Sequence, residues 1–129
     1  MKKFIFCAIF ALSGCAQPGG VSGAPGPFKR TEASVFWEGS RLATGESWSR
    51  HKSANTVLTA HRTLPLGSWV QIRRGTTCVN VQVRDRGPAA WTHRDLDLSL
   101  GAAALLGING VGKVEYAPLP SREGHATMC

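Results

Sequence analysis

The stretch "SWVQIRRGTTCVNVQVRDRGP", Ser68 to Pro88, decides how this chain folds. It contains two β-branched, partly apolar runs, 68–74 and 78–84, joined by a short segment with a glycine at position 75. In the second run valines alternate with polar residues, which is typical of a strand with one buried face. The glycine suits a tight connection, so the sequence predicts a β-hairpin.

Short β-like runs continue on both sides of this hairpin. Residues 33–37 and 55–60 precede it, and residues 112–118 follow it. One segment, "SLGAAALLG" at 99–107, predicts a helix that begins at a serine cap and ends at a glycine. Short strands and one small helix in about ninety residues predict a compact, mostly β barrel. We expect the folded domain to span 31–120, followed by a loose tail at 121–129.

The first fourteen residues predict a signal peptide that is removed from the mature protein. Lys2 and Lys3 precede an apolar run at 4–12 that is too short to cross a bilayer. The run ends in "LSGC", which resembles the lipobox of bacterial lipoproteins. That resemblance implies cleavage before Cys15 and acylation of its thiol, which would hold the protein stably on a membrane. The residue after Cys15 is alanine and not aspartate, which is similar to lipoproteins sent to the outer membrane.

Residues 15–30 are expected to be a tether between the lipidated cysteine and the folded domain. Residues 16–27 are rich in glycine and proline and contain no charge, as in flexible linkers. Without Lys2 and Lys3, 13 basic residues face 8 acidic ones, so the mature net charge is +5. A basic surface suits an anionic polymer. Because an exported, lipid-anchored protein does not meet nucleic acid, we expect cell-wall polymer and membrane as partners, and a monomer.

Two cysteines, Cys78 and Cys129, remain once Cys7 is removed with the signal and Cys15 carries lipid. An exported protein folds where disulfides form, so we expect these two to pair. Two free thiols, or a bond from Cys129 to another molecule, are the alternatives.

Three segments, "AHRTLPLGSWV", "VRDRGP" and "RDLDLSLGAAALLG", follow one another in the order and approximate spacing of the rare lipoprotein A family. The resemblance covers roughly residues 33–118. It implies a six-stranded double-psi β-barrel with one short helix. The chain departs from the family pattern at Arg84, where an asparagine is usual, and in its opening strand. The same barrel carries unrelated activities, so the fold alone does not establish one.

Family members that are enzymes are lytic transglycosylases, which cut peptidoglycan glycan strands and leave a 1,6-anhydro sugar. One carboxylic acid suffices for this reaction, because it protonates the leaving oxygen and then accepts a proton from the C6 hydroxyl of the substrate. The resemblance assigns that acid to Asp85. Two other roles remain open for this residue: Arg84 and Arg86 would oppose general-acid work if they lie close, and the carboxylate could simply fix the following turn.

His61 matches a second family position and is the other expected catalytic residue, either assisting the acid or orienting the sugar. A buried histidine that holds the loop after it is the alternative. We expect Asp97 and Arg62 to bind substrate, although Asp97 also suits the start of the helix and Arg62 suits an ion pair. Trp48 and Trp91 lie in loop-like segments and are expected to stack on sugar rings, unless they are core residues.

No histidine or cysteine spacing in the sequence is typical of a metal site, so we expect neither metal nor cofactor. Two functions remain: an endolytic lytic transglycosylase, and a wall-binding or wall-loosening module that grips glycan without cutting it, as in expansins. Both place the protein in the bacterial cell envelope, anchored to the outer membrane and facing the periplasm.

Overall fold

A computed structural model describes residues 25–120 and 125–129 of the 129-residue chain. The predicted signal peptide, Cys15 and most of the tether therefore lie outside the described residues. Seven strands and two α-helices make up the described part, and neither helix is long and apolar enough to cross a membrane.

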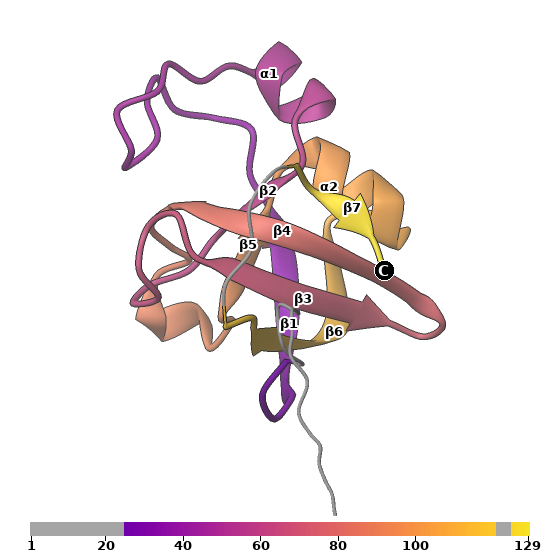
Figure 1. The fold of residues 1–129 in the computed structure, drawn as a ribbon. Coiled ribbons are helices and arrows are strands. Elements are labelled where there is room, and N and C mark those ends of the chain that lie inside the picture. The colour runs from indigo at the N-terminus through magenta and orange to yellow at the C-terminus, as the bar shows by residue number, and fades with distance from the viewer. Residues whose placement is uncertain (1–24, 121–124) are drawn as a thin grey trace, which may run out of the picture.

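Six strands form a closed mixed barrel (Figure 1). They are β1 (Lys29–Val35), β2 (Leu58–Ala60), β3 (Trp69–Arg74), β4 (Thr77–Asp85), β5 (Leu96–Leu98) and β6 (Val111–Pro118). The order around the barrel is β2-β5-β1-β6-β3-β4, and a parallel pairing between β2 and β4 closes it. The prediction of a six-stranded, mostly β barrel with one main helix is confirmed.

The predicted hairpin is the antiparallel pair of β3 and β4, with Trp69 opposite Gln82 and Arg74 opposite Thr77. Alternation works as expected, because the side chains of Val79, Val81 and Val83 are fully buried in the core. Burying one valine contributes about 1.5–3 kcal/mol, so these three alone fix which face of β4 is internal.

The main helix, α2 (Leu100–Leu106), has the predicted ends. Ser99 Oγ accepts a hydrogen bond from the backbone N–H of Ala102, and Gly107 adopts the left-handed conformation that terminates the helix. Ser99 Oγ also donates to Thr56 O and accepts from Leu58 N, so the cap fastens α2 to the start of β2. A shorter helix, α1 (Arg50–Asn55), occupies residues where the sequence suggested only the beginning of a strand.

The boundaries of the barrel differ from the expected ones at both ends. β1 begins at Lys29, which pairs with Tyr116, so the barrel starts two residues earlier than the expected position 31. At the other end β7 (Thr127–Met128) pairs with Val79 and Asn80 of β4, and Cys129 is joined to Cys78 by a disulfide. The last residues of the expected tail are therefore part of the sheet.

β7 fills a specific gap. β2 is three residues long and pairs with β4 only between Gln82 and Asp85. β7 pairs with β4 at Val79 and Asn80, in the first half of that strand. Two short strands thus share β4, one from each end of the domain.

Two apolar clusters fill the molecule. The larger one lies inside the barrel and includes the buried faces of β3, β4, β5 and α2. A smaller one lies under the segment between β1 and α1 and consists of Leu42, Trp48 and Leu58, with Phe36 packed against it. This second cluster holds that segment over the end of β4 that carries Asp85.

Candidate active site

Two acidic residues from neighbouring parts of the barrel lie in one row across its strands. Asp85 of β4 is in register with Ala60 of β2, and Ala60 is in register with Asp97 of β5. The row continues to Ser34 of β1. Residues in register project from the same face of a sheet, and two strand spacings separate the two aspartates by roughly 10 Å. The barrel therefore brings together two of the predicted site residues.

The carboxylate of Asp85 is held by backbone groups on one of its two oxygens. Oδ1 accepts hydrogen bonds from the N–H of Ala43 at 2.9 Å and of Arg86 at 2.8 Å. Within the described residues no hydrogen bond reaches Oδ2. Asp85 is half-buried, so the carboxylate has a fixed orientation and keeps one oxygen for another partner.

The two arginines that flank Asp85 are both engaged with other groups. Arg84, at the family's asparagine position, makes a two-pronged ion pair with Glu46, whose pKa burial would raise but the bonds from Arg84 and Thr44 hold below its usual value. The Arg86 guanidinium donates to the carbonyls of His61 and Leu64. Each guanidinium thus supports a loop beside Asp85.

Asp97 also has one oxygen occupied. Its Oδ1 accepts a short hydrogen bond from the hydroxyl of Ser34. Its Oδ2 lies 3.5 Å from the place where a Cβ on Gly87 would stand, and Gly87 has a φ of +132° that only glycine adopts without strain. The turn after Asp85 therefore passes directly over Asp97.

His61 is the buried end of a hydrogen-bonded chain. Its Nδ1 accepts from the backbone N–H groups of Thr63 and Leu64, both at 3.1 Å. The ring proton must then be on Nε2, which lies 3.1 Å from the hydroxyl of Tyr116. That hydroxyl donates to Asp95 Oδ2 at 2.8 Å. The imidazole is 8% exposed, and both of its nitrogens are used inside the protein.

Burial lowers the pKa of His61, although the nearby negative charge of Asp95 acts in the opposite direction. Burial and the adjacent Asp95 both raise the pKa of Tyr116. Burial alone would raise the pKa of Asp95, but hydrogen bonds from Lys29 and Tyr116 outweigh it and lower that pKa. The chain is therefore neutral at His61 and Tyr116 and anionic at Asp95.

Arg62, expected to bind substrate, is a contact between loops. Its guanidinium donates to the carbonyls of Pro88 and Arg94 and forms an ion pair with Asp95 at 3.0 Å. It fastens the 88–95 segment to the loop that follows β2.

The two predicted tryptophans have opposite environments. Trp48 is 7% exposed and packs against Phe36 with 5.5 Å between ring centroids, which leaves no open ring face for a sugar. Trp91, in a single 3₁₀ turn at Ala90–Thr92, is 80% exposed. Its segment follows the turn that covers Asp97, so this aromatic ring is available on the side that carries the candidate site.

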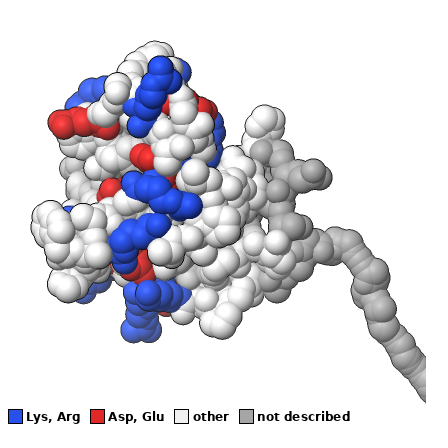
Figure 2. All heavy atoms as spheres, turned by 90° about the vertical axis from the view of Figure 1, so that its left-hand side faces the viewer, with Lys and Arg blue, Asp and Glu red and all other residues white. Residues whose placement is uncertain are grey.

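Basic side chains gather on the side of the barrel where β4 ends. Figure 2 shows this side, with Lys and Arg forming a band in which a few acidic groups are interspersed. Among residues 25–120 and 125–129, no cluster of three or more His, Cys, Asp or Glu side chains is arranged to hold a metal ion.

Residues 30–116 match the family model described as "Lytic transglycolase". The chain belongs to this family of double-psi β-barrel proteins. Two relatives are both named "Probable endolytic peptidoglycan transglycosylase RlpA". The one from Synechocystis sp. is 42% identical over 83 residues, 60% of this chain and 24% of that protein. The one from Nostoc sp. is 40% identical over 77 residues, 57% of this chain and 19% of that protein. The match thus spans a quarter or less of these relatives.

A solved structure also shares the lytic transglycolase fold. The "Streptomyces papain inhibitor (SPI)" superposes with a TM-score of 0.58 at 20% sequence identity, over 74% of this chain and 96% of its own. At this identity the likeness concerns the barrel alone.

Sequence reasoning missed Tyr116 and Asp95 as partners of His61. One signal was present: Val114 and Tyr116 are two residues apart in the last strand, so both point into the barrel. A tyrosine in a barrel core needs a partner for its hydroxyl, and Asp95 is the acidic residue that the topology brings there.

Proposed function

We propose that this protein acts on the glycan strands of peptidoglycan as an endolytic lytic transglycosylase, with Asp85 as the general acid and base. The observation that carries this proposal is the state of the Asp85 carboxylate. Two backbone N–H groups orient it through Oδ1, while Oδ2 is left for a substrate on the face that also bears Asp97. The names of the two relatives agree with this substrate.

In this reaction protonated Asp85 donates its proton to the glycosidic oxygen as the bond from that oxygen to C1 of the N-acetylmuramic acid unit breaks. The C6 hydroxyl oxygen of the same unit forms a bond to C1, and its proton passes to the Asp85 carboxylate. The acid is thereby regenerated, and a 1,6-anhydro sugar and a shortened strand are released without uptake of water. A water-using glycosidase requires a second carboxylate as nucleophile or base, and this route does not.

His61 contributes as a positioning residue in this scheme. Its Nδ1 organises the loop whose carbonyls hold Arg86, and its own N–H donates to the carbonyl of Asp85 at 3.2 Å. Asp97 and Trp91 supply a hydrogen-bonding group and an exposed ring for the sugars on either side of the scissile bond.

A non-catalytic glycan-binding module is the second candidate. The bond from Arg86 N–H to Asp85 Oδ1 joins adjacent residues and also suits a carboxylate that only fixes a turn. Purified protein incubated with peptidoglycan sacculi, followed by mass spectrometry of the soluble fragments, separates the two. Anhydro-terminated fragments support the enzyme, whereas binding without such fragments supports the module.

The anchor is a further part of the proposal. The "LSGC" motif supports acylation of Cys15, attachment to the outer membrane and a position facing the periplasm, and the Gly- and Pro-rich residues after it would let the barrel reach the wall.

A further inference from the structure

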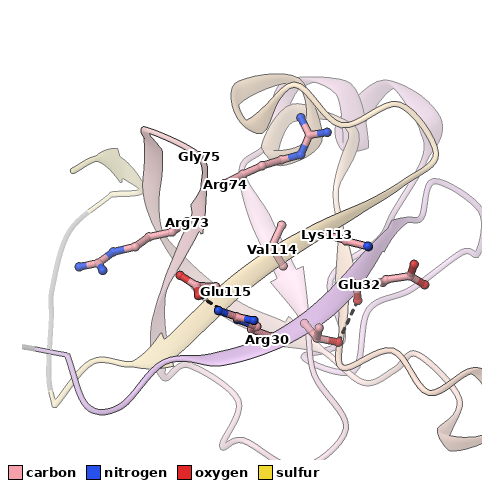
Figure 3. A pocket seen from close by; sticks show the side chains of 9 residues that line it. Arg30, Glu32, Arg73, Arg74, Gly75, Lys113, Val114 and Glu115 are labelled. Atoms are coloured by element: carbon pink, nitrogen blue, oxygen red, sulfur yellow. Dashed lines mark hydrogen bonds and ion pairs between the residues drawn. The ribbon is translucent and has the colours of Figure 1, made fainter.

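A second groove lies on the outer surface of β1, β6 and β3, away from the row of Asp85 and Asp97 (Figure 3). Its volume is about 530 Å³, within the range of pockets that hold small ligands. The residues that line it are mostly charged: Arg30, Thr31, Glu32, Arg73, Arg74, Gly75, Lys113, Val114 and Glu115.

The groove arises where two strands separate. Pairing between β3 and β6 ends with Arg73 opposite Glu115, and β3 then enters the turn at Gly75. Val114, which is 4% exposed, lies at the middle of the space that opens, and Arg73 and Arg74 extend to opposite sides of it (Figure 3). The groove is therefore a consequence of the barrel topology and has a firm floor.

Cations outnumber anions here by four to two. Arg30, Glu115 and Arg73 form one row across the strands, and Arg30 pairs with Glu115 at 3.5 Å. Arg73 lies over the ring of Phe28 at 3.9 Å, which holds its position without using its N–H groups. Lys113, opposite Glu32, makes no ion pair with any described residue. Arg73 and Lys113 are thus the cations most available to a ligand.

The groove is continuous with the candidate active site along β1. Arg30, Glu32 and Ser34 alternate with the inward-facing Ala33 and so share the outer face of that strand. Ser34 binds Asp97, and four residues of strand separate it from Arg30, a distance of roughly 13 Å. A glycan that lies over Asp97 would therefore carry its side groups towards the groove.

We infer that this groove binds a peptide stem of the peptidoglycan strand that lies in the active site, with Arg73 and Lys113 holding stem carboxylates. The inference rests on the proposed function. Stem peptides carry more carboxylates than amines, and the groove has the complementary composition, an excess of cations with two carboxylates among them. Glu32 and Glu115 would repel a uniformly anionic surface such as a phospholipid headgroup layer, so they favour the peptide.

The test measures co-sedimentation of the full chain, in detergent, with insoluble sacculi whose stem peptides are intact or have been removed by an amidase. All proteins carry Asp85→Asn so that the polymer is bound without being cut. The groove variant is Arg73→Gln with Lys113→Gln. The control, Arg50→Gln with Lys52→Gln, removes the same charge from exposed positions on α1. Thermal melting shows whether each variant is folded.

We expect the groove variant to bind intact sacculi about fivefold more weakly than the control, as for two exposed ion pairs, with the difference shrinking in high salt. On sacculi without stems the two should bind equally. An equal loss on both kinds of sacculi, equal binding by variant and control on intact sacculi, or groove-dependent binding to anionic phospholipid vesicles overturns the inference.

A separate measurement distinguishes failure of this inference from failure of the proposed function. With Asp85 restored, anhydro-sugar release from stem-free glycan should be the same in the groove variant and the control. If the unaltered protein releases no anhydro sugar, the proposed reaction is wrong, and the binding comparison still tests the groove.

Discussion

Asp85 and Asp97 come from strands that do not pair with each other, yet both are in register with the same residue, Ala60. The short strand β2 is therefore the spacer that sets the distance between the two carboxylates. Its alanine side chain is small, so the surface between them is not filled by a larger group.

Replacing each aspartate separately tests the assignment of the acid. Asp85→Asn keeps the acceptor for Ala43 and Arg86 but removes the proton donor, so it should lower anhydro-sugar release by at least about a hundredfold. Asp97→Asn should retain more activity and raise KM. Mass spectrometry of released sugars checks both, with melting temperature as the control for folding. Full activity in a folded Asp85→Asn protein would exclude Asp85 and point to Asp97.

The pKa of His61 predicts acid-sensitive stability. Because burial lowers this pKa, the unfolded chain binds a proton that the folded chain does not as pH falls below about 6.5. The stabilisation is fully present above that pH and is lost as pH falls through the lower, folded-state pKa. We expect the melting temperature to fall between pH 7 and pH 5. His61→Gln should be less stable at pH 7 and show a flatter profile; an unchanged profile in this variant would contradict the assignment.

Asp95 adds a second step at lower pH. Its pKa is also lowered in the fold, so its contribution is present above about pH 4 and lost below it. The two steps involve one hydrogen-bonded chain through Tyr116, so Tyr116→Phe, which breaks the chain while keeping the ring, should weaken the stability difference between pH 7 and pH 5.

The disulfide predicts a large difference between the oxidised and reduced protein. Cys78 and Cys129 are 51 residues apart, and closing a loop of this size contributes about 4 kcal/mol by restricting the unfolded chain. Urea denaturation of the protein and of the Cys78→Ser, Cys129→Ser double variant should show a loss of this order. Equal midpoints, with both thiols open to alkylation in the native protein, would contradict it.

Gly101 predicts an exception to a helix rule. Alanine is favoured over glycine inside helices by about 1 kcal/mol, so Gly101→Ala in α2 would ordinarily stabilise. Here the added Cβ would stand 2.5 Å from the backbone oxygen of Thr56, which cannot move without displacing the start of β2. We expect a net loss of about 1–3 kcal/mol. Ala104→Ser, exposed on the same helix, is the control and should change little.

The anchor is tested by Cys15→Ser. The variant should stay uncleaved by the lipoprotein signal peptidase and carry no lipid, which fractionation and mass spectrometry would show. A mature-sized variant that still sediments with membranes would refute acylation at this residue.

The sequence predicted the long elements of the fold and missed the short ones. Alternation over nine residues in β4 is a strong signal, whereas Leu96–Leu98 offers one alternation and was not recognised as β5. Its strand character comes from pairing with β1 on one side and β2 on the other. Such pairing is a tertiary effect that local composition does not reveal.

The candidate site was predicted in its residues better than in their environments. Motif order placed Asp85 and Asp97 together, but it did not show that Arg84 turns to Glu46 or that Trp48 lies in a core cluster. Both depend on how the segment between β1 and α1 folds over the barrel. That segment has no regular periodicity, so its contacts are set by packing against elements distant in the sequence.

The sharing of β4 between β2 and β7 makes the order of export and oxidation important. Until β7 is fastened, the backbone of β4 around Val79 and Asn80 is an open edge that a second chain can pair with. Protein retained in a reducing cytoplasm therefore carries an adhesive strand that the oxidised, exported protein has covered. Overproduction without export should yield self-associated material, and the same chain delivered to an oxidising compartment should remain dispersed.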